Sequence, residues 1–223
     1  GPFVAGRTIR SNALILQLDP DDPDAEAAEI ARLAAQNQAA IENALQAQLA
    51  QVATAEDALQ LQRIADALPE SDLRLALETL LRESAGRGVR VTADKLSQLA
   101  LGVNWRLSNE AARLWAQNYS YELVSLLTEN TRAMLADAIA AWVDSGEPLG
   151  TLIDGVASIF GAARAEAIAV TEATRAYAEG SFTLYEQAGF NTRPAEGDRP
   201  PAHPRCRCWV SLAEVKPGEW HYL

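Results

Sequence analysis

The sequence predicts an all-α protein, mostly a helical bundle, that ends in an irregular segment rich in cysteine and histidine. Alanine and leucine dominate, β-branched residues are sparse and aromatic residues make up only 6%, a balance that favours helix over strand. Apolar residues recur at helical spacing along most of the chain, which indicates amphipathic helices. With 223 residues the chain can bury a sizeable core in one domain or two.

The charge balance bears on the partners of the protein. The net charge is −11 and the pI is about 4.7, which argues against a free-standing binder of duplex DNA. No apolar run reaches the roughly 18 residues of a membrane span, and no secretory signal opens the chain. The only two cysteines lie two residues apart and cannot build a disulfide framework, so we expect a reducing cytosol. Gly1-Pro2 resembles the scar of a cleaved tag.

The first region, residues 3–106, is interpreted as an N-terminal helical arm that binds a partner. Residues 13–18 form a short apolar run that fits a strand or an extended arm. Six acidic residues and two prolines between Asp19 and Glu29 indicate a turn that leads into a helix N-terminus. The spacing then predicts a helix over residues 25–52. Its apolar seam is thin and rich in glutamine, so we expect it to lean on a partner or to self-associate.

Several shorter helices are predicted next. Thr54 and Asp57 resemble a capping box that starts a helix ending near Leu68, before Pro69. A short helix follows over residues 73–81, and we expect Gly86-Arg-Gly88 to end it. Thr92 is then expected to cap a helix through Leu101, which Gly102 ends.

The second half contains two long helices. The first is predicted over residues 109–143, with an apolar stripe and a stop at Gly146-Glu-Pro148. A helical piece over residues 149–160 leads to the second, over residues 162–188. From residue 191 to 204 the chain holds four prolines and no periodicity, so a loop is expected.

The helix over residues 162–188 has two distinctive faces. One carries only small residues, namely Ala165, Ala169, Ala173, Ala176 and Gly180, and such a face lets another helix approach closely. The adjacent side carries a polar seam of Arg164, Thr171, Glu172 and Arg175. We interpret the seam as an ion-pair network that holds the helix against its neighbours, with an anion site as the alternative.

All four soft metal ligands of the chain lie in its last 21 residues: His203, Cys206, Cys208 and His221. Two thiolates and two imidazoles are a permissible tetrahedral zinc set, and two cysteines that are two apart point the same way in an extended segment. C-x-C is, however, a poorer chelate than C-x-x-C, and His221 lies thirteen residues beyond Cys208. The alternative is that the cysteines are small packed residues and the histidines are surface groups.

Catalysis is not expected. A Cys-His pair is present, but no acid is placed to orient the imidazole, and the sequence has no nucleotide-binding or metalloprotease motif. The tail is locally basic through Arg193, Arg199, Arg205 and Arg207, which are candidate phosphate contacts. It lacks the interleaved aromatic residues of a single-strand platform.

Two motifs together carry a resemblance to a known family. The first is Arg164-Ala165, Ile168-Ala169 and Thr171-Glu172; the second is Pro201-x-His203-Pro204-x-Cys206-Arg207-Cys208. Together they resemble the phage minor head proteins, the Mu F-like head-morphogenesis group, over residues 109–209. On this basis residues 107–223 are interpreted as the Mu F-like domain.

The resemblance implies a structural virion protein that is present in few copies inside the head, associated with the portal. It would act in head assembly and in DNA packaging or ejection, and would reside in the host cytoplasm during assembly. Similar modules also occur attached to toxin domains, so a nucleic-acid-binding or effector module is the alternative. Relatives usually carry a C-x-x-C segment before the H-P-x-C-R-C motif. Only thirteen residues separate Gly189 from His203 here, so that segment is absent from this position. If it follows residue 223 instead, the domain is truncated at its C-terminus.

Overall fold

The helix predicted over residues 25–52 forms in the computed structural model as α1, Pro23–Val52. The structure describes residues 23–98, 103–190, 193–195, 198–216 and 219–222. The apolar run over residues 13–18 and the first part of the acidic turn therefore lie outside the described residues. The apolar seam of α1 is buried within the same chain, against α3 and the later helix over residues 162–187, and Ile30, Ile41 and Val52 are each fully covered. Self-association through this helix stays a prediction.

The next two helices correct the predicted boundaries. Helix α2, Ala58–Asp66, is capped by Asp57 alone, whose side chain accepts a hydrogen bond from the Gln60 backbone N–H. Thr54 is no cap, because its hydroxyl donates to the Gln51 carbonyl at the end of α1. Helix α3 runs without a break from Ser71 to Gln98, so the predicted end at Gly86-Arg-Gly88 and the predicted restart at Thr92 are both wrong. The reason is tertiary: Gly88 lies where α3 meets another helix.

The second half follows the sequence-based expectation closely. Helix α4, Trp105–Ser145, starts where the Asn104 side chain accepts from the Leu107 N–H, and ends at Gly146, which adopts a left-handed conformation with φ of 68°. Glycine suits this position because it has no Cβ. Helix α5, Leu149–Val156, continues into the short 3-10 helix η1, Ala157–Phe160. Helix α6, Ala162–Gln187, follows.

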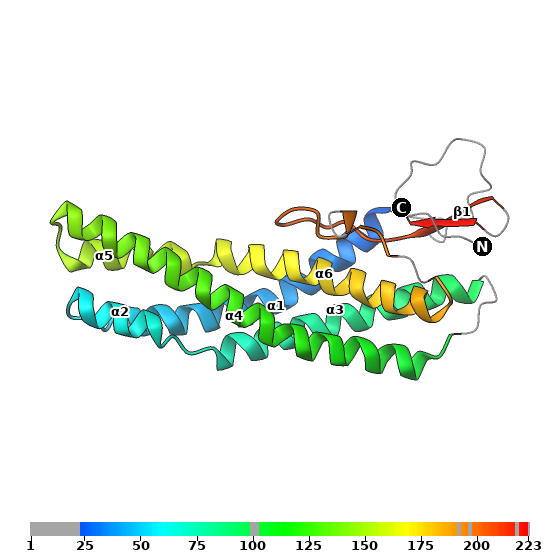
Figure 1. Ribbon diagram of the computed structural model, residues 1–223, viewed down its shortest axis with the longest axis horizontal. Coiled ribbons are helices and arrows are strands. Elements are labelled where there is room, and N and C mark those ends of the chain that lie inside the picture. Colours follow the sequence, from blue (N-terminus) through cyan, green and yellow to red (C-terminus); the bar gives the residue numbers. More distant parts are fainter. Residues whose placement is uncertain (1–22, 99–102, 191–192, 196–197, 217–218, 223) are drawn as a thin grey trace.

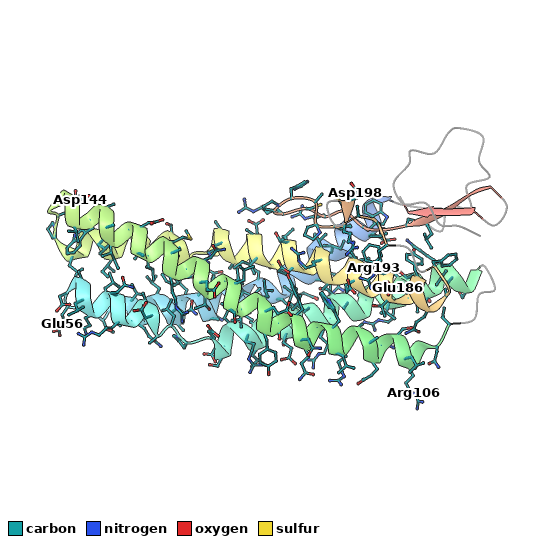
Figure 2. The ribbon with its side chains drawn as sticks, viewed as in Figure 1. Glu56, Arg106, Asp144, Glu186, Arg193 and Asp198 are labelled. Atoms are coloured by element: carbon teal, nitrogen blue, oxygen red, sulfur yellow. The ribbon has the colours of Figure 1, made fainter. Side chains whose placement is uncertain are left out.

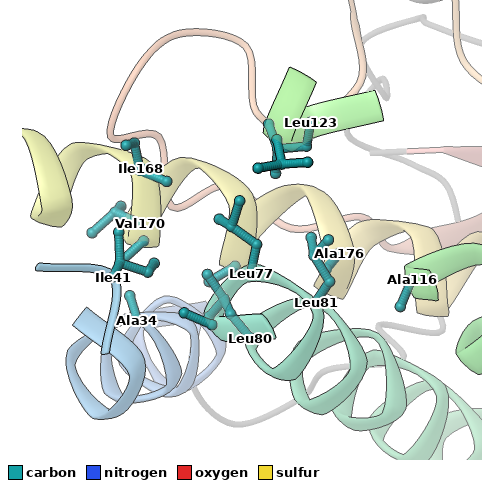
Figure 3. Close-up of a cluster of buried hydrophobic side chains, with 14 of the residues drawn as sticks. Ala34, Ile41, Leu77, Leu80, Leu81, Ala116, Leu123, Ile168, Val170 and Ala176 are labelled. Atoms are coloured by element: carbon teal, nitrogen blue, oxygen red, sulfur yellow. The ribbon is translucent and has the colours of Figure 1, made fainter. Parts of the chain in front are cut away.

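Helix α6 is the central element of the elongated bundle (Figure 1). It packs along α3, α1 and α4, and α3 also packs along α4. Figure 3 shows Ile41 of α1, Leu77 of α3 and Val170 of α6 in one cluster of buried apolar side chains. The predicted regions 3–106 and 107–223 thus contribute to one core, while the division near residue 106 stays a prediction.

The chain beyond α6 begins irregularly, as predicted, and then forms a small hairpin. Strands β1, Leu212–Lys216, and β2, Glu219–Tyr222, pair antiparallel with Leu212 opposite Tyr222. The described part of the chain is thus all-α apart from this hairpin. None of its helices combines the length and apolar character needed to cross a bilayer.

Candidate functional site

The site is built on α6, whose small-residue face is buried as predicted. Ala165, Ala169, Ala173 and Ala176 have no exposed surface, and Gly180 is buried with them. Small side chains allow α3 and α1 to approach α6 closely. The helix is therefore held rigidly, and it can position the polar side chains on its other faces.

The first part of the polar seam fastens α6 to α4 and η1. The Arg164 guanidinium donates to the Ile159 carbonyl at 2.7 Å and to the Thr131 hydroxyl at 2.9 Å. It also reaches the Leu127 carbonyl at 3.4 Å. Burial lowers the pKa of Arg164. The Arg164 side chain therefore has a structural role, since its hydrogen bonds join α6 to η1 and α4.

The second part of the seam is a buried carboxylate. Glu172 is 6% exposed and pairs with Arg175 at 3.0 Å, whose guanidinium lies 5.7 Å from the centre of the Tyr119 ring. Burial raises the pKa of Glu172, and the opposing effects of Arg175 and Tyr119 do not cancel it. Glu172 and Arg175 therefore form an ion pair within α6, and Arg175 contacts α4 through the Tyr119 ring.

Two threonines on α6 bind the backbone of residues 201–208, called the cysteine-bearing segment below. The Arg205 backbone N–H donates to the Thr171 hydroxyl at 3.0 Å, and the Thr174 hydroxyl donates to the Cys206 carbonyl at 2.5 Å. Sequence reasoning included Thr171 in the seam but missed Thr174. Its position one helical turn after Thr171, on the same side of α6, was the available signal.

The two cysteines come together as the C-x-C spacing predicted. Their sulfur atoms lie 2.8 Å apart and both thiols are free. Cys206 is 1% exposed, whereas Cys208 is exposed. Burial acts to raise the pKa of Cys206, but hydrogen bonds from the Cys208 thiol and from nearby backbone N–H groups bring it below its usual value. The hydrogen bond to Cys206, together with burial, raises the pKa of Cys208 to about 11.

The histidines do not complete a metal site among the described residues. The exposed His203 has its Nδ1 3.1 Å from the neighbouring Pro204 carbonyl, and His221 lies in β2 opposite Ala213. Within the described ranges no group of three or more potential ligands comes together. The two thiols provide two convergent ligands of the four that structural zinc takes. Zinc binding by His203, Cys206, Cys208 and His221 therefore stays a prediction.

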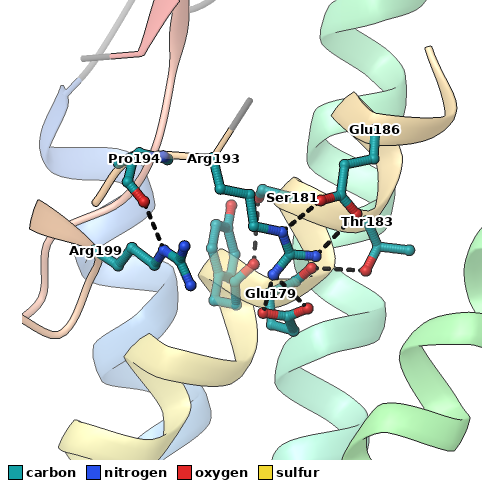
Figure 4. Close-up of polar contacts among 8 residues, drawn as sticks. Glu179, Ser181, Thr183, Glu186, Arg193, Pro194 and Arg199 are labelled. Carbon is teal, nitrogen blue, oxygen red and sulfur yellow. Dashed lines mark hydrogen bonds and ion pairs between the residues drawn. The ribbon is translucent and has the colours of Figure 1, made fainter. Parts of the chain in front are cut away.

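The four tail arginines differ in what they contact. Arg193 pairs with Glu179 at 2.7 Å and with Glu186 at 2.5 Å, and it covers the Phe182 ring at 5.2 Å. Figure 2 places Arg193 and Glu186 near the end of α6, and Figure 4 shows the guanidinium between the two glutamates. Arg199 donates to the Pro194 carbonyl (Figure 4). Arg193 is therefore a structural residue and a poor candidate for a phosphate contact.

The remaining two arginines flank Cys206 and are exposed. Arg205 lies 3.5 Å from Glu166 and donates to the Ala163 carbonyl. Its backbone is left-handed, with φ of 60°, an uncommon conformation for a residue with a side chain. Directly after Arg205, the Cys206 side chain is buried, while the side chains of Arg207 and Cys208 are exposed.

Comparison of the chain with models of protein families, with curated proteins and with solved structures gives no match.

Proposed function

We propose that this chain is a structural minor head protein of a tailed phage or prophage. It would lie inside the virion head next to the portal and act in head assembly and in DNA packaging or ejection. The proposal begins from the two sequence motifs that resemble the Mu F-like group, and one observation supports it further. The two motifs, separated by about thirty residues of chain, pack against each other through the bond between the Arg205 backbone and Thr171. Thr174, just beyond the first motif, adds a bond to the Cys206 carbonyl.

The use of the polar groups also favours a scaffold. Arg164, Glu172 and Arg193 are among the side chains that sequence alone would offer as binding groups, and each is paired with another group of the fold. Their bonds join α6 to α4 and to the segment that follows α6. A helical bundle cross-linked in this way suits a structural protein that connects other head components. The same side chains are then not available to bind a substrate.

The direct test is the protein content of purified particles. Virions of the phage or prophage that encodes the chain are banded on a density gradient, and their proteins are quantified by mass spectrometry against the portal protein. We expect the chain in DNA-filled particles in a small, fixed ratio to the portal. Its absence from particles in which the portal is readily detected would refute the proposal.

A disruption of the gene adds a functional readout. Complementation by the wild-type gene should restore DNA-filled particles, and complementation by Ala169→Leu should restore fewer. Ala136 of α4 is exposed, so Ala136→Leu serves as the matched control and should complement fully. Equal yields of filled particles with and without the gene would contradict a role in assembly or packaging.

The alternative is a nucleic-acid-binding or effector module that uses the basic tail. What favours it is the exposure of Arg205 and Arg207 beside the cysteines. A gel-shift titration at two ionic strengths separates the two functions, because phosphate contacts weaken steeply with salt. Salt-sensitive binding that Arg207→Gln weakens would favour this module, and no binding at low salt would remove it.

A further inference from the structure

The cysteine pair has a feature that neither packing nor zinc ligation requires. One thiol is buried and the other is exposed, while their sulfur atoms are only 2.8 Å apart. A reagent in solution can therefore reach Cys208 directly, but it can reach Cys206 only through Cys208. This is the arrangement of an attacking thiol with a resolving thiol behind it.

The backbone fixes this arrangement from several sides. The Cys206 N–H donates to the His203 carbonyl at 3.1 Å, and the Cys206 carbonyl accepts from Thr174 on α6. The Cys208 N–H in turn points at the Cys206 sulfur, at 3.4 Å. The two sulfur atoms are thus held close by bonds to a rigid helix, and a bond of about 2.05 Å between them needs a movement of less than about 1 Å.

We propose that Cys206 and Cys208 form a reversible dithiol–disulfide pair that exchanges with small anionic disulfides, of which oxidised glutathione is the representative. The exposed Cys208 thiol attacks one sulfur of glutathione disulfide and passes its proton to the adjacent Cys206 sulfur. The S–S bond of glutathione disulfide breaks, and the first glutathione leaves as a thiolate, which takes up that proton in turn. Cys206 then attacks the Cys208 sulfur, the mixed disulfide breaks, and the second glutathione leaves. The protein loses two electrons and two protons, and glutathione disulfide gains them.

The preference for an anionic partner comes from the neighbouring arginines. Arg205 and Arg207 flank Cys206 and are exposed, whereas the chain as a whole has a net charge of −11. A local positive charge attracts the carboxylates of glutathione. The positive charge of Arg205 is partly offset by the nearby carboxylate of Glu166. Arg207 should therefore contribute more to the attraction of an anionic disulfide.

The biological setting rests on the proposed function, although the chemistry does not. A virion component is assembled in a reducing cytoplasm and then leaves the cell for an oxidising environment. The two cysteines would stay reduced during assembly and would form their disulfide after the particle is released. Closure would fix the cysteine-bearing segment in the position that it already occupies on α6.

The test uses the full chain in glutathione buffers of graded oxidised-to-reduced ratio, with a chelator so that metal cannot protect the thiols. Acid quenching, alkylation and intact-mass measurement count the reactive thiols. Because the chain has only two cysteines, we expect both to be lost together, with a product lighter by two hydrogens and no glutathione attached. Persistence of both thiols across the range, stable glutathione adducts or disulfide-linked dimers would each overturn the proposal.

Two serine variants and one arginine variant sharpen the test. In Cys206→Ser the reaction should stop at the mixed disulfide between Cys208 and glutathione. In Cys208→Ser the buried Cys206 thiol should stay unreactive until the chain is unfolded. Arg207→Gln should slow exchange with glutathione disulfide severalfold but leave exchange with neutral hydroxyethyl disulfide unchanged. Equal slowing with both reagents would refute the anion preference. None of these readouts depends on virions, so their failure is distinguishable from failure of the proposed function.

Discussion

Gly88 of α3 lies directly against Tyr177 of α6, so closely that a Cβ on Gly88 would stand 2.0 Å from the Tyr177 carbonyl oxygen. The contact is reciprocal, because a Cβ on Gly180 of α6 would stand 2.0 Å from the Ala85 carbonyl oxygen of α3. The two backbones therefore touch at two glycines. This close crossing holds α3 against α6 and explains why α3 does not end at Gly86-Arg-Gly88.

The first prediction concerns these glycines. Gly88→Ala and Gly180→Ala should each destabilise the protein by about 1–3 kcal/mol or more, because the obstructing atoms belong to the backbone and cannot rotate away. Gly86 is the control, since nothing lies within 4 Å of a Cβ there, and Gly86→Ala should stabilise α3 by up to about 1 kcal/mol. Urea unfolding of the three variants measures the differences. Equal effects at Gly86 and Gly88 would contradict the close crossing.

The second prediction concerns the small-residue face further along α6. Ala169 is fully buried, so Ala169→Leu overfills the interface and should cost about 1–3 kcal/mol of unfolding free energy. The exposed Ala136→Leu in α4 should change stability by less than about 0.5 kcal/mol. Unfolding of Ala169→Leu at the wild-type denaturant midpoint would count against a docking role for this face.

The third prediction separates the structural arginine from the exposed one. Arg193 is held between Glu179 and Glu186, and the hydrogen bond with Glu186 is the main cause that raises the pKa of Arg193. Because these are charge-assisted bonds at a half-buried site, Arg193→Gln should cost roughly 1–3 kcal/mol. The cost should shrink in high salt. Arg207→Gln should unfold like the wild type, and a larger loss there than at Arg193 would reverse this assignment.

The fourth prediction is a pH dependence at Glu172. Burial raises the pKa of this carboxyl above its usual value of 4.5, so the native state binds its proton more tightly than the unfolded chain does. The stability contribution of Glu172 is therefore fully present below pH 4.5 and declines as the pH rises through the native pKa. Glu172→Gln mimics the protonated form. The variant should match the wild type in acid and become the more stable protein at neutral pH.

Unfolding free energies measured between acidic and neutral pH test this directly. An advantage of Glu172→Gln that grows as the pH falls would show the opposite sign. Such a result would mean that the ion pair with Arg175 outweighs the burial of the carboxylate.

The fifth prediction addresses zinc. A site made of His203, Cys206, Cys208 and His221 predicts about one zinc per chain in protein purified without chelator. His221→Ala should lower that content, and Arg199→Gln, which leaves all four ligands in place, should not. Metal content below about 0.2 equivalents would leave the four-ligand hypothesis without support.

Sequence by itself determined the helical class and the bounds of α1, α4 and α6. Apolar periodicity, the Gly146 stop and the alanine face of α6 are local properties that the chain carries before it folds. The Asn104 cap, which starts α4 before the predicted residue 109, was missed. The convergence of Cys206 and Cys208 was equally predictable, because alternate residues of an extended segment point the same way.

Only the tertiary structure decided the rest. The continuity of α3 through Gly88 depends on α6, since the roughly 1 kcal/mol that this glycine costs the helix is offset by packing that local sequence does not contain. The same holds for Thr174, which binds a carbonyl 32 residues away, and for Arg193, whose partners make it a structural residue. The way in which the whole chain buries its apolar faces decides which of these distant groups meet. A local sequence pattern does not contain that information.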